Sequence, residues 1–186
     1  MRLFICTLLS DDNQAFHDQH VARLVDSSHG VLRPIPRSSA HLTYAFLPAV
    51  GETEYERIVA AMDAIEDPGP IAVRLGHPIV RYARKQPRSV CVDVLSGGPE
   101  LTTLAQAVIE ALNGACPSAR LNAVRSLHVT LARFRRGAVR KDGEVVEGVL
   151  KTSELGSPRH DTISQLEVVE SRLTPAGPLY TVRHRT

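Results

Sequence analysis

Two apolar segments of the chain carry the same polar pattern, and this pattern restricts how the chain can fold. The segments are AHLTYAFLP at residues 40–48 and LHVTLARF at residues 127–134. Successive side chains of a strand point to opposite faces, so the histidine, threonine and alanine of each segment would share one face. These residues are His41, Thr43 and Ala45 in the first segment and His128, Thr130 and Ala132 in the second. The apolar residues between them would form the core, which leaves an imidazole on the other face of each strand.

The remaining apolar patterns predict a mixed α+β fold. Strand-like runs alternate with amphipathic helical segments at about 11–26, 54–65 and 99–113. A polar loop is expected over residues 135–160, with a short helix near residues 145–150. Successive strands are joined by links too short for crossover helices, so we expect antiparallel sheets. The predicted strands are 3–9, 41–47, 71–80, 88–95, 127–134, 163–173 and 179–184.

The two histidines differ from the other histidines of the chain in their context. Four of the eight histidines are followed at the second position by Ser or Thr, namely His41, His128, His160 and His184. About one such match is expected by chance. His160 follows a turn-like segment and His184 lies near the C-terminus. Only the first two lie inside apolar runs, in two halves that resemble each other, and this favours a functional role for the pair.

Two imidazoles and two hydroxyls suit the chemistry of a phosphate diester. The unperturbed pKa of histidine is ~6.5, so one imidazole can accept a proton while the other donates one. Each threonine hydroxyl can donate a hydrogen bond to an anionic phosphate oxygen. The pattern therefore predicts His41 and His128 as the catalytic acid–base pair and Thr43 and Thr130 as phosphate-binding residues. This reaction requires no metal ion.

Other kinds of site fit the sequence poorly. Neither motif offers a third ligand at zinc spacing, and His17 and His20 are expected on the solvated face of a predicted helix. The chain contains no Gly-x-Ser-x-Gly segment and no glycine-rich phosphate loop. We therefore expect neither a metal ion nor a cofactor.

The composition is that of a globular protein from a reducing compartment. Of the 186 residues, 43% are hydrophobic and 23% are charged, and three scattered cysteines do not form a disulfide framework. The apolar run at residues 3–9 is followed by two aspartates, so we interpret it as a strand rather than a signal peptide. No apolar run approaches the ~20 residues of a membrane helix. We expect a cytoplasmic protein without a membrane partner.

With both motifs in place, the sequence resembles the two-histidine phosphoesterases, and most closely the RNA 2′,3′-cyclic phosphodiesterase (2′-5′ RNA ligase) family. HLTYAFL and HVTLARF match the paired motifs of this family. The opening RLFICTLL and the closing LEVVESRLTPAGPLY at residues 166–180 resemble its first and last segments. The chain departs from the family at FLPAV, where Phe-Leu-Gly is usual, and in having no proline before the second motif.

The resemblance implies a single domain over residues 1–186. Two pseudo-symmetric lobes with antiparallel sheets and flanking helices would surround a central cleft. The implied activity is hydrolysis of an RNA or nucleoside 2′,3′-cyclic phosphate to a 2′-phosphomonoester, with His41 as the acid and His128 as the base. Reversible 2′-5′ RNA ligation, or nucleotide or RNA binding without catalysis, are the alternatives. RNA ends or cyclic nucleotides would be the substrates of a monomer with no obligatory protein partner.

The second motif suggests two further substrate contacts. Phe134 has the same strand parity as His128 and is the candidate for stacking on a base, whereas Tyr44 and Arg133 fall on the core side by parity. Arg135 follows the end of the predicted strand and could turn toward a phosphate.

Overall fold

The computed structural model describes residues 1–186 except 68, 118–120, 124–125, 154–158 and 176. The predicted α+β class is confirmed, because four helices flank one antiparallel sheet among the described residues. The helices are α1 (Asp11–Ser27), α2 (Glu52–Asp63), α3 (Gly98–Ala115) and α4 (Arg140–Lys151). The strands are β1 (Leu3–Leu8), β2 (Leu32–Pro34), β3 (His41–Leu47), β4 (Ile71–Ala83), β5 (Gln86–Ser96), β6 (Asn122–Ala123), β7 (His128–Phe134), β8 (Arg159–Ile163), β9 (Glu167–Thr174) and β10 (Gly177–Arg185).

The two motif strands lie in the middle of the sheet. Its order is β10-β9-β1-β3-β7-β5-β4-β8, so three strands follow on each side of the central pair β3 and β7. The central strands are joined at the pair Leu42 and Val129. Beyond this pair they diverge, since the second half of β3 pairs with β6 and the second half of β7 pairs with β2. The two halves of the sheet are therefore arranged alike around their junction.

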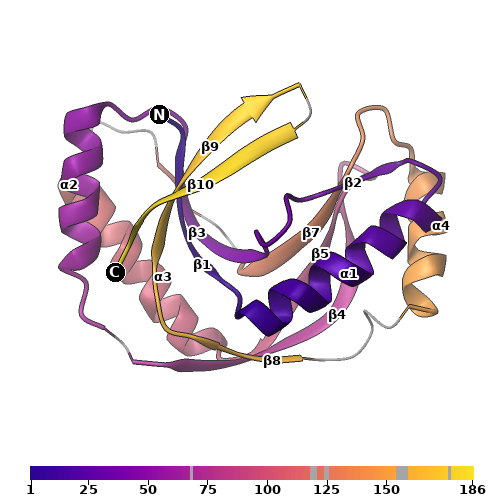
Figure 1. Cartoon of the computed structure of the whole chain (residues 1–186), viewed down its shortest axis with the longest axis horizontal. Coiled ribbons are helices and arrows are strands. Elements are labelled where there is room, and N and C mark those ends of the chain that lie inside the picture. Colours follow the sequence, from indigo (N-terminus) through magenta and orange to yellow (C-terminus); the bar gives the residue numbers. More distant parts are fainter. Residues whose placement is uncertain (68, 118–120, 124–125, 154–158, 176) are drawn as a thin grey trace.

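The helices of the molecule form two pairs. Helices α2 and α3 pack on each other, and α3 contacts β3 and also β4 in the other half of the sheet. Helices α1 and α4 contact each other and pack on β7 and on β4 and β5, respectively. Figure 1 shows the first pair on the left of the molecule and the second pair on the right, with the yellow hairpin of β9 and β10 projecting at the top.

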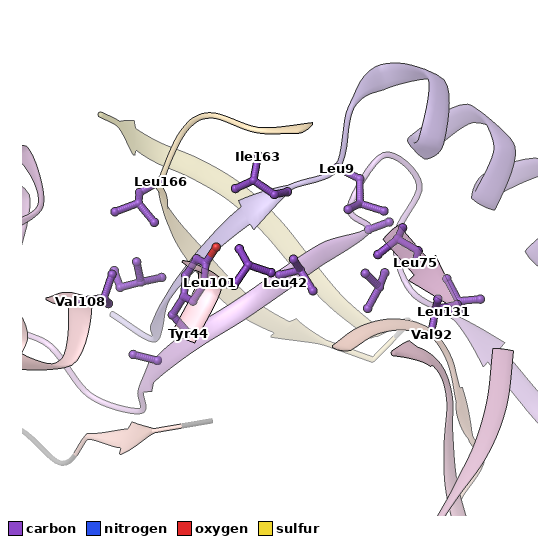
Figure 2. Close-up of a cluster of buried hydrophobic side chains, with 14 of the residues drawn as sticks. Leu9, Leu42, Tyr44, Leu75, Val92, Leu101, Val108, Leu131, Ile163 and Leu166 are labelled. Carbon is purple, nitrogen blue, oxygen red and sulfur yellow. The ribbon is translucent and has the colours of Figure 1, made fainter. Parts of the chain in front are cut away.

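A hydrophobic core joins the sheet to these helices. Figure 2 shows Leu42 of β3, Leu101 of α3 and Leu131 of β7 within this cluster, and all three are fully buried. Burying one such leucine stabilises a fold by about 1.5–3 kcal/mol. The apolar side of each motif strand therefore faces the core, as the alternation of its residues predicts.

Each motif strand contains a β-bulge that reverses this alternation after the threonine. Thr43 and Ala45 lie opposite successive residues of β1, which leaves Tyr44 as the extra residue of β3. Thr130 and Ala132 lie opposite successive residues of β5, which leaves Leu131 as the extra residue of β7. A bulge inserts one residue into one strand only, so every later side chain points to the other face.

The bulges correct several expectations from strand parity. Both motif alanines, Ala45 and Ala132, are fully buried in the core, although the sequence pattern placed them beside the histidines. Phe134 is also a core residue, with an exposed fraction of only 7%, so its predicted position beside His128 is wrong. Arg133, which strand parity placed on the core side, is exposed. The prediction that Tyr44 faces the core is confirmed.

The predicted loop at residues 135–160 is wrong over much of its length. Helix α4 begins at Arg140, earlier than the short helix expected near residues 145–150. The Asp142 carboxylate accepts a hydrogen bond from the Val139 amide at 2.8 Å, and Val146 and Leu150 bury one face of the helix. The first turn, residues 140–143, contains no apolar side chain, which is why the sequence pattern missed it. Residues 154–158 of the expected loop lie outside the described residues.

None of the helices among the described residues combines the length and the apolar character that crossing a bilayer would require.

Candidate active site

The first motif histidine lies at the start of β3, against two aromatic rings. The His41 ring stacks on Phe4 of β1 with 4.8 Å between ring centroids. The Tyr180 ring of β10 lies nearly perpendicular to it, with 5.8 Å between ring centroids. The ring is held from behind because its Nδ1 hydrogen-bonds to the Ser39 carbonyl oxygen at 2.5 Å. A carbonyl oxygen can only accept, so Nδ1 carries a proton and Nε2 is the free nitrogen.

Helix α1 fixes the backbone directly before this histidine. The side-chain amide of Gln14 donates to the Ala40 carbonyl oxygen at 2.7 Å and accepts from the Ala40 amide at 2.8 Å. Gln14 is itself buried, which explains a polar residue on the inner face of an otherwise weakly amphipathic helix. This pairing gives β3 a fixed starting point.

The second motif histidine is held by the same kind of contact. The Nδ1 atom of His128 hydrogen-bonds to the Ser126 carbonyl oxygen at 2.8 Å, again two residues earlier in the chain. The neighbouring groups are polar rather than aromatic: Asp93 lies opposite His128 on β5, and the Arg81 guanidinium pairs with the Asp93 carboxylate. The two histidines therefore present the same ring nitrogen, Nε2, from different surroundings.

The register of the central strands brings the four polar motif residues together. Because Leu42 pairs with Val129 in antiparallel fashion, His41 comes next to Thr130, and Thr43 comes next to His128. All four side chains are half-buried, on the face opposite the core. The two histidines are diagonal neighbours, a relation that corresponds to roughly 7–8 Å between strands. The register thus alternates histidine and threonine across the two central strands.

The two imidazoles differ in their affinity for a proton. Burial lowers the pKa of His41, and the cationic Arg133 and His128 lower it further, although the bond to the Ser39 carbonyl acts in the opposite direction. The pKa of His128 is raised, chiefly by a hydrogen bond with the Cys91 thiol group and against the effect of burial. In the free protein, His41 is thus the better candidate for the neutral form and His128 for the protonated form.

The Cys91 thiol links the second histidine to its threonine. Its Sγ donates to the Ser89 hydroxyl at 3.2 Å and lies 3.8 Å from the Thr130 hydroxyl oxygen. Burial would raise the pKa of Cys91, but hydrogen bonds with His128 and Ser89 outweigh it and the pKa is lowered. Cys91 is fully buried.

The comparisons with known proteins give one related sequence and several related folds. No family model matches the chain. The chain is 27% identical over 147 residues to the RNA 2′,3′-cyclic phosphodiesterase of Aquifex aeolicus (strain VF5), which covers 77% of this chain and 75% of that protein. The crystal structure of TT0787 of Thermus thermophilus has a TM-score of 0.74 at 21% identity and covers 100% of this chain and 96% of its own. The apo form of E. coli LigT has a TM-score of 0.71 at 18% identity and covers 100% of this chain and 95% of its own.

The chain has the same fold as TT0787 and E. coli LigT. The resemblance to the two-histidine phosphoesterases, predicted from the paired motifs, is confirmed. E. coli LigT has also been crystallised with 3′-AMP, and that structure has a TM-score of 0.71 at 16% identity.

The LigT-like fold of this chain adds residues to the site that sequence reasoning missed. Phe4 and Tyr180 come from β1 and β10, far from either motif, and both lie in segments that the resemblance had marked without giving them a role. Arg133 was rejected by parity, yet the bulge turns it toward Tyr180, where its charge also acts on His41. Arg135 lines the same groove as Arg133 and Tyr180, and its part in substrate binding stays a prediction.

The described residues were also compared with the side-chain clusters that bind metal ions. No cluster of three His, Cys, Asp or Glu side chains with ligand geometry occurs among the described residues. His17 and His20 are buried rather than on a solvated face, so that expectation is wrong. Helix α1 turns them inward, where the His20 ring packs on Phe16 and its Nδ1 lies 2.8 Å from the Phe16 carbonyl oxygen.

Proposed function

We propose that this protein hydrolyses 2′,3′-cyclic phosphates of RNA or nucleosides to 2′-phosphomonoesters, with His41 and His128 as its acid–base pair. The observation that carries the proposal is the matched anchoring of both rings through Nδ1, on central strands whose register makes the two histidines diagonal neighbours. The similarity to the Aquifex aeolicus RNA 2′,3′-cyclic phosphodiesterase supports the substrate class.

The reaction needs one proton acceptor and one proton donor. One imidazole takes a proton from water through Nε2, and the water oxygen attacks phosphorus. The bond between phosphorus and the ribose 3′ oxygen breaks, and the other imidazole gives its proton to that oxygen. The hydroxyls of Thr43 and Thr130 donate to the non-bridging oxygens, where negative charge grows in the transition state. The product keeps a 2′-phosphate and gains a free 3′ hydroxyl, and no step requires a metal ion.

Two observations disagree on which histidine is the acid and which is the base. The family resemblance favours His41 as the acid and His128 as the base, whereas the pKa directions of the free protein favour the reverse. A substrate with sulfur in place of the 3′ oxygen distinguishes them, because a thiolate leaves without a proton from the enzyme. Loss of the acid would be rescued by this substrate, and loss of the base would not.

The activity is tested with an oligonucleotide ending in a 2′,3′-cyclic phosphate, in the presence of EDTA. We expect turnover by the unmodified protein and a loss of at least about 100-fold in His41→Ala and in His128→Ala, the usual scale for removal of a general acid or base. Far-ultraviolet circular dichroism would verify that both variants fold. Full activity in either folded variant would exclude the two-histidine mechanism. Analysis of the products, with a 5′-hydroxyl strand present, separates hydrolysis from 2′-5′ ligation and from binding without turnover.

A further inference from the structure

We propose that an arginine-lined groove next to His41 binds the phosphodiester backbone of the RNA strand whose cyclic end occupies the active site. This inference rests on the proposed function, because it takes the cyclic phosphate as the group between the two histidines. The groove has a volume of about 550 Å³ and lies between the segment 33–37, the end of β7 and the hairpin of β9 and β10. The charged side chains of its lining are all cationic: Arg33, Arg37, Arg133 and Arg135.

The arrangement of these arginines is unfavourable without an anion. Arg33 and Arg133 lie directly opposite each other on β2 and β7, a position in which like charges repel. Within the described part of the chain, none of the four arginines forms an ion pair with a carboxylate. The Nε of Arg135 donates to the Gly30 carbonyl oxygen at 2.6 Å, which fixes the side chain and leaves its charge uncompensated. Bidentate binding of phosphate is the usual role of such a cluster.

The groove continues into the active site through two shared residues. Tyr180 lines the groove and also packs nearly perpendicular to the His41 ring, with 5.8 Å between ring centroids. Arg133 lines the groove and contributes to the lowered pKa of His41. A 3′-terminal cyclic phosphate has nucleotides only on its 5′ side. The groove therefore accommodates the phosphodiesters that immediately precede the cyclic end.

The lining favours recognition of the backbone without reading of the bases. Between the arginines the walls are formed mainly by proline and aliphatic side chains, namely Pro34, Ile35, Pro36, Pro175 and Pro178. Arginine contacts to phosphates position a strand but carry no sequence information. We therefore expect a dependence on strand length and on salt, with little dependence on sequence.

The groove is held in shape by the backbone of its walls. The Ile35 amide donates to the Leu131 carbonyl oxygen at 3.2 Å, and the Arg135 amide donates to the Val31 carbonyl oxygen at 2.8 Å. The Ser38 amide donates to the Asp18 carboxylate at 2.9 Å. The arginines thus stand on anchored segments, which limits the ordering needed when a strand binds.

The test compares kcat/KM for four substrates with the same terminal cyclic nucleotide: the nucleoside, its 5′-phosphorylated form, a dinucleotide and a tetranucleotide. We expect kcat/KM for the tetranucleotide to exceed that for the nucleoside by about 100-fold at low salt, the product of two contributions of about tenfold. Arg33→Gln and Arg37→Gln should each lower this ratio by about tenfold, since hydrogen bonds to charged groups have effects of this size. Each loss should also flatten the log–log salt dependence for the tetranucleotide by about 0.7. Arg57→Gln, an exposed arginine on α2, is the matched control and should leave the ratio unchanged.

The outcomes separate this inference from the proposed function. Equal kcat/KM for the nucleoside and the tetranucleotide would overturn the groove proposal while leaving the hydrolase intact. If the 5′-phosphorylated nucleoside alone reached the kcat/KM of the tetranucleotide, the groove proposal would also be overturned, because the groove would then bind a small nucleotide rather than a strand. An unchanged ratio of kcat/KM between the tetranucleotide and the nucleoside in the Arg33→Gln, Arg37→Gln double variant would likewise overturn the groove proposal. Failure to hydrolyse any of the four substrates would instead refute the proposed function.

Discussion

The two halves of the sheet place different side chains on the same backbone plan. In the first half, Thr43 lies opposite Cys6 and Phe46 lies opposite Phe4. The corresponding pairs in the second half are Thr130 with Cys91 and Arg133 with Ser89. Both motif strands have a bulge after the threonine, and both histidines bond to a carbonyl oxygen two residues earlier.

The difference lies in what surrounds each imidazole. The first half is aromatic around His41, with Phe4, Phe46 and Tyr180 gathered in a small cluster. The second half is polar around His128, with Ser89, Cys91, Asp93 and Arg81 nearby. Because the backbone anchoring is matched, the opposite pKa directions have other causes. Burial and the charges of Arg133 and His128 lower the pKa of His41, and the hydrogen bond with Cys91 raises the pKa of His128. A near-symmetric scaffold thus gives two imidazoles with different affinities for a proton.

The largest predicted difference between the two halves is in how much one side chain contributes to the free energy of unfolding. Phe4→Ala removes a buried ring from the aromatic half and should lower the free energy of unfolding by about 3–5 kcal/mol. The equivalent change in the polar half, Ser89→Ala, should cost less than about 1.5 kcal/mol, since it removes only a hydroxyl that accepts from Cys91. Urea denaturation of both variants gives the two values. Similar losses would show that the aromatic ring around His41 has no special part in the packing.

The two halves also differ in the helices that cover them, and this difference predicts a loss of stability at acidic pH. In the second half, α1 buries His17, and neither of its ring nitrogens has a hydrogen-bond partner among the described residues. Burial, aided by Arg159 and opposed by Asp161, lowers the pKa of His17 to about 4. The unfolded chain therefore takes up a proton between pH ~6.5 and ~4 that the folded protein excludes, and stability falls as the pH falls through this range.

This contribution is testable by denaturation at pH 7 and at pH 4.5. His17→Met cannot be protonated, so it should reduce the acid loss of stability by roughly 2 kcal/mol relative to the unmodified protein. His77→Met, at an exposed position on β4, is the control and should leave the loss unchanged. An unaltered acid loss in the His17 variant would show that this histidine is already charged, or solvated, in the folded protein.

The smallest predicted effect concerns the two cysteines that lie opposite the motif threonines. Cys91→Ala removes the thiol contact that raises the pKa of His128, so that pKa should fall and the corresponding limb of the pH–rate profile should move to lower pH. Cys6→Ala makes the same change in the other half, where burial raises the pKa of the thiol well above its ordinary value, and should leave this limb in place. Equal profiles for the two variants would contradict a role for Cys91 in setting the charge of His128.

Local patterns were enough to predict the α+β class, most strands and the face on which each motif histidine lies. Local patterns failed where the neighbouring strand determines which face of the sheet a side chain occupies. A bulge depends on how β3 meets β1 and how β7 meets β5, so strand parity alone exchanged the positions of Phe134 and Arg133. The aromatic wall of His41 comes from β1 and β10, which only the folded topology brings together. The buried polar face of α1 likewise follows from partners such as Ala40, far along the chain.

The central claim is that His41 and His128 flank one phosphate and differ in proton affinity, and a titration by ¹H–¹⁵N correlation of the imidazole rings tests it most directly. In the free protein both neutral rings should carry the proton on Nδ1, and His128 should titrate at a higher pH than His41. Addition of a nucleoside 2′-monophosphate should raise both pKa values, since an anion stabilises each imidazolium. A response confined to one ring, or a His41 that titrates at or above the pKa of His128 in the free protein, would contradict the account.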